Sequence, residues 1–66
     1  DVYKRQAVSR ADYIISNLPN SEVVQKALEI KVQAYDLMGK EELKNQAAEV
    51  LKRFIEASEK KAAANS

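Results

Sequence analysis

Apolar residues recur along most of this chain at intervals of three and four, the spacing that places side chains on one face of an α-helix. The first such stretch predicts a helix over residues 7–18, which ends before Pro19 because the residue preceding a proline disfavours the α-helical conformation. The second predicts a helix over residues 22–38, which ends at Gly39, the only glycine, since glycine readily adopts the left-handed conformation that terminates helices. The third predicts a helix over residues 41–58.

Each predicted helix carries apolar stripes that we expect to be buried. They comprise Ala7, Val8, Ala11, Ile14, Ile15 and Leu18 in the first helix, Val23, Val24, Ala27, Leu28, Ile30, Val32, Ala34, Tyr35, Leu37 and Met38 in the second, and Leu43, Ala47, Val50, Leu51, Phe54 and Ile55 in the third. The middle helix is apolar around most of its circumference, which predicts that it packs between the other two. In particular, Ile30, Leu37 and Val50 should lie in the shared core.

The connections between the predicted helices have only two or three residues, which forces neighbouring helices to run antiparallel. The predicted fold is therefore all-α, with three antiparallel helices forming two helical hairpins that share the middle helix. Of the two residues able to cap the middle helix, Asn20 and Ser21, we expect Ser21 to be the N-cap, with Glu22 in the positive first turn. A spacing of alanine and large apolar residues near residue 11 recurs near residue 51, which suggests a lengthened tetratricopeptide (TPR) repeat.

Composition narrows the function to binding rather than catalysis. The chain has 66 residues, 45% of them hydrophobic, a formal charge of +1, and no cysteine or histidine. We therefore expect no enzyme activity, no cofactor and no zinc site. The basic pairs Lys52-Arg53 and Lys60-Lys61 alternate with glutamates at helical spacing, which indicates a solvated face rather than a nucleic-acid site.

Several linked motifs resemble the C-terminal TPR region of the BamD (YfiO) family, which comprises outer-membrane assembly lipoproteins of Gram-negative bacteria. The motifs are Ala11-x-Tyr13-Ile14-Ile15-x-x-Leu18-Pro19-Asn20-Ser21, Val24-x-x-Ala27-Leu28-x-Ile30, Ala34-Tyr35-Asp36-Leu37-Met38-Gly39, and Leu43, Ala47, Val50 and Leu51. The resemblance covers about residues 8–51 and implies a TPR-like scaffold at the periplasmic face of the outer membrane. It departs from the family where Ser9-Arg10 stands in place of Asn-Arg.

The ends of the chain differ from its centre. Residues 1–6 look like a translated sequencing adaptor, so we expect them to be a non-native leader and the natural protein to extend further upstream. The family's lipid-anchoring cysteine would lie in that upstream part. Residues 7–58 form the TPR-like hairpins in this interpretation. Residues 59–66 contain no bulky apolar side chain and are expected to be a frayed polar tail.

Three residues are candidates for protein binding: Arg10, Tyr13 and Asp36. The resemblance implies that Arg10 contacts a periplasmic POTRA domain of BamA, where a guanidinium can pair with a carboxylate. The alternative for Arg10 is a solvated position or an internal ion pair with Asp36 or Glu29. Tyr13 is either an exposed interface anchor or, as tyrosines at helix-packing edges more often are, a filler of the core.

BamC-like and BamE-like lipoproteins are further partners that the resemblance implies. Two other interpretations remain open at this point. One is a different TPR scaffold, such as the periplasmic domain of a Tol-Pal coordinator of the CpoB/YbgF type. The other is a self-associating helical bundle that uses an exposed apolar stripe.

Overall fold

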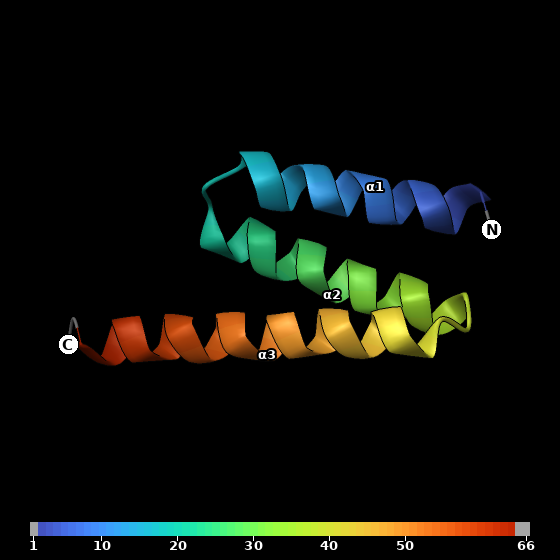
Figure 1. Cartoon of the computed structure of the whole chain (residues 1–66). Coiled ribbons are helices and arrows are strands. Elements are labelled where there is room, and N and C mark those ends of the chain that lie inside the picture. The colour runs from blue at the N-terminus through green and yellow to red at the C-terminus, as the bar shows by residue number, and fades with distance from the viewer. Residues whose placement is uncertain (1, 65–66) are drawn as a thin grey trace.

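Three helices make up the computed structural model, which describes residues 2–64 of the chain. They are α1 (Val2–Asn17), α2 (Ser21–Leu37) and α3 (Glu41–Ala64), and they run antiparallel to their neighbours (Figure 1). The backbone measures 43 × 22 × 12 Å along its principal axes. The predicted all-α class with three antiparallel helices is confirmed, and the helices form a single layer.

The middle position of α2 is also as predicted. It packs against α1 on one side and against α3 on the other, and within residues 2–64 no Cα atom of α1 lies within 8 Å of a Cα atom of α3. α3 is longer than α2, and its C-terminal part extends past the connection between α1 and α2 (Figure 1). Phe54, expected in the core, is only half-buried.

The observed helices extend beyond two of the predicted bounds. α1 begins at Val2 rather than at residue 7, and α3 continues through Ala64 rather than ending at residue 58. Both added segments lack Gly and Pro, and the extension of α3 is rich in Ala, Glu and Lys, which are strong helix formers. A non-native segment can form a helix as readily as a native one, so the helical conformation does not test whether residues 1–6 are a non-native leader. That assignment stays a prediction. The predictions for Asp1, Asn65 and Ser66 lie outside the described residues.

The turn between α1 and α2 is capped by Asn20, so the expectation of Ser21 as N-cap is wrong. Asn20 has an extended backbone (φ −76°, ψ 118°). Its side-chain oxygen accepts hydrogen bonds from the backbone N–H of Glu22 at 2.9 Å and of Val23 at 3.2 Å. Because Ser21 is already the first helical residue, it cannot serve as the cap.

Gly39 terminates α2 as the sequence predicts. Its φ of +72° lies in the left-handed region. The Gly39 N–H donates to the Asp36 carbonyl at 3.1 Å, and the Lys40 N–H donates to the Tyr35 carbonyl at 2.9 Å. These two bonds form a Schellman motif, which satisfies carbonyls at the end of the helix.

The buried core consists mostly of small residues: Ala11, Ala27, Leu28, Ala34 and Ala47. The expectation of burial is wrong for Ile30, Leu37 and Val50, which are 44%, 67% and 52% exposed. It is also wrong for Leu18, Val23 and Leu43, which are exposed as well. Alanines let neighbouring helices approach closely, and a single layer leaves the two broad faces of α2 without a covering element. The apolar arc of α2 is wider than its two neighbours can cover.

Candidate protein-docking site

The structure does not gather the three candidate binding residues into one cluster. Arg10 and Tyr13 lie on α1, whereas Asp36 lies on α2 and is paired with a residue of α3. Arg10 is exposed. None of the ion pairs formed within the described residues includes Arg10, and its suggested internal partner Asp36 is engaged elsewhere. The Arg10 guanidinium is therefore accessible to another protein.

Tyr13 is 66% exposed, so the interpretation of this residue as a core filler is wrong. Tyr13 lies one turn before the end of α1, where its backbone carbonyl accepts a hydrogen bond from the Asn17 side chain at 2.9 Å. This bond ties the Asn17 side chain back to the preceding turn of the same helix. The tyrosine ring itself is available as an interface anchor.

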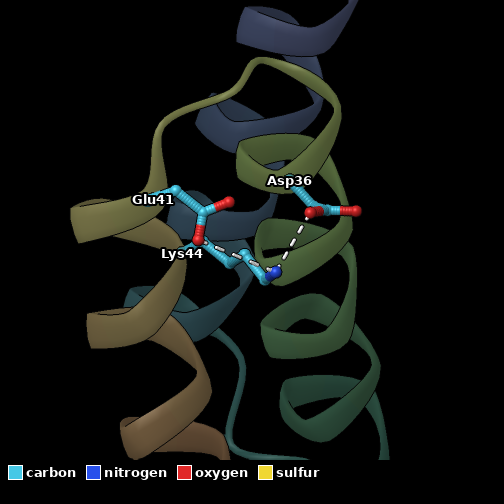
Figure 2. Close-up of polar contacts among 3 residues, drawn as sticks. All are labelled: Asp36, Glu41 and Lys44. Atoms are coloured by element: carbon cyan, nitrogen blue, oxygen red, sulfur yellow. Dashed lines mark ion pairs between the residues drawn. The ribbon is translucent and has the colours of Figure 1, made fainter.

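Asp36 forms part of a three-residue charge cluster at the turn between α2 and α3. The Lys44 ammonium of α3 lies 3.1 Å from the Asp36 carboxylate and 4.0 Å from Glu41 (Figure 2). The hydrogen bond that the Lys44 ammonium donates to Asp36 raises the pKa of Lys44 above its ordinary value of 10.5, and the negative charges of Asp36 and Glu41 act in the same direction. Asp36 thus connects two helices of its own chain, and one carboxylate edge remains exposed to solvent.

A second ion pair joins α1 to α2. The Lys31 ammonium lies 2.8 Å from the Asp12 carboxylate, and the lysine side chain is only 21% exposed. Neither interhelical pair was predicted from the sequence. Only the pair between α2 and α3 had a sequence signal: Asp36 and Lys44 lie close to the two ends of the turn at residues 38–40, whereas Asp12 and Lys31 are not equally distant from the turn at residues 18–20.

One broad face of the layer carries a groove of about 310 Å³ between α1 and α3, with α2 as its floor. Its apolar lining comprises Ile15, Leu28, Tyr35, Leu43, Ala47 and Val50, and its polar lining comprises Asp12, Ser16, Lys31 and Gln46. The charged residues in this groove, Asp12 and Lys31, already neutralise each other. Such a groove suits the apolar side of another protein better than a charged small molecule.

Neither a metal-ligand cluster nor a membrane-spanning helix occurs in the described part of the chain. Within residues 2–64, no three acidic, histidine or cysteine side chains gather as a metal site. Over the same residues, no helix combines the length and apolar character required to cross a bilayer. The features that remain are surfaces: the exposed Arg10, the groove and the apolar side chains on the broad faces.

Comparison with known proteins supplies the family. The chain matches the model of the YfiO family, described as outer membrane lipoprotein, over residues 2–51. Neither the curated proteins nor the solved structures compared with it gave a match. The matched region includes all of α1 and α2 and the first half of α3. Since it covers most of the sequence, the chain belongs to the YfiO family of outer membrane lipoproteins.

Proposed function

We propose that this chain is a protein-interaction module, the C-terminal TPR-like part of a BamD-like lipoprotein, and that it docks on a periplasmic POTRA domain of BamA. In this proposal it works without catalysis at the periplasmic face of the outer membrane. BamC-like and BamE-like lipoproteins are further partners. Family membership supports the link to the outer membrane, and the surface of the molecule supports a docking role.

The observation that carries the docking role is the unpaired Arg10. Its side chain is exposed on α1, and no carboxylate within the described residues pairs with it. An arginine fork that is not engaged internally can form two parallel hydrogen bonds with a carboxylate of a partner. Tyr13, also exposed on α1, offers an aromatic surface three residues further along the helix.

The rigid arrangement of the helices supports the same role. Two interhelical ion pairs, Asp12–Lys31 and Asp36–Lys44, fix α2 to its two neighbours. A partner that binds α1 therefore meets a helix whose backbone is already folded and packed on α2, and this lowers the ordering cost of association.

The test is binding of an Arg10→Leu variant to an isolated BamA POTRA fragment. We expect affinity to fall about tenfold or more, because a charge-assisted hydrogen bond is lost at the interface. Helicity measured by circular dichroism should not change, since Arg10 makes no internal ion pair. Arg53→Leu is the matched control, because Arg53 is an exposed arginine on α3 whose partner, Glu49, lies on the same helix at 3.3 Å.

Two outcomes would contradict the proposal. If the parent chain does not bind any POTRA domain, the docking role is wrong. If Arg10→Leu and Arg53→Leu bind as tightly as the parent, Arg10 is a solvated residue and another surface makes the contact.

A further inference from the structure

We draw no further inference here: the strongest candidate, the exposed apolar surface patch that Val23, Ile30 and Leu37 form on the middle helix α2, carries none because nothing in the structure shows what covers it.

Discussion

Leu28→Ala is the substitution that tests most directly how this single layer of helices is held together. Among the residues whose side chains the structure describes (2–61), Leu28 is the only large one in the buried core, at 3% exposed, and the other core residues are alanines. It lies on α2 at the floor of the groove, where residues of α1 and α3 also line the surface. The substitution therefore removes the largest buried apolar group at the point where the three helices come closest to sharing a core.

The expected cost is about 2–3 kcal/mol of unfolding free energy. Leu→Ala substitutions in cores cost about 2–5 kcal/mol, and the cost is smaller where the surroundings can relax or solvent can reach the vacated space. Leu28 borders an open groove, which favours the lower end of that range. A chain of 66 residues is expected to have a total stability of only about 3–10 kcal/mol. The variant should thus lose a large share of its stability and melt at a markedly lower temperature.

Leu37→Ala is the matched control, because it makes the same chemical change in the same helix at a side chain that is mostly exposed. It should cost less than about 1 kcal/mol, since little apolar surface returns to water. Both variants should be unfolded by urea and followed by circular dichroism. Equal destabilisation by the two substitutions would refute the burial pattern on which the description of the core depends.

Two further predictions concern the turns. Asn20→Ala should lower the unfolding free energy by about 1 kcal/mol, because the first backbone N–H groups of α2 lose their acceptor. Ser21→Ala should change the unfolding free energy little. Urea unfolding of both variants shows which residue is the N-cap. Lys44→Met should lower the unfolding free energy at neutral pH. The difference in unfolding free energy between this variant and the parent should shrink as the pH rises above 10.5, because a lysine with a raised pKa in the folded state stabilises only while its ammonium is protonated. A difference that stays constant through that range would show that the ion pair with Asp36 is not its cause.

The sequence predicts the helices and their ends well where a local cause exists. Pro19 and Gly39 act on the backbone of their immediate neighbours, so the two connections are fixed without knowledge of the packing. The identity of the N-cap was harder, because Asn20 and Ser21 both carry a suitable oxygen. Only the backbone conformation, extended at Asn20 and helical at Ser21, decides between them.

Burial was not predictable in the same way. An apolar arc on a helix shows that some element could cover it, but not that one does. Ile30 and Ala34 both lie on the predicted stripe, yet the alanine is buried and the isoleucine is exposed. The difference arises because the small side chain faces a close neighbour while the large one lies on a broad face of the layer. Interhelical ion pairs such as Asp12–Lys31 depend equally on the packing register.

The alanine-rich contacts between the helices connect the weak core to the binding role. Small residues at Ala11, Ala27 and Ala47 bring the helices close together but bury little apolar area, and stability scales with the area buried. The larger side chains lie instead around the groove and, away from it on α2, at Val23, Ile30 and Leu37. A layer built in this way gains much of its remaining apolar burial only when another surface covers it. Exposed apolar patches of this kind are typical of interfaces between proteins.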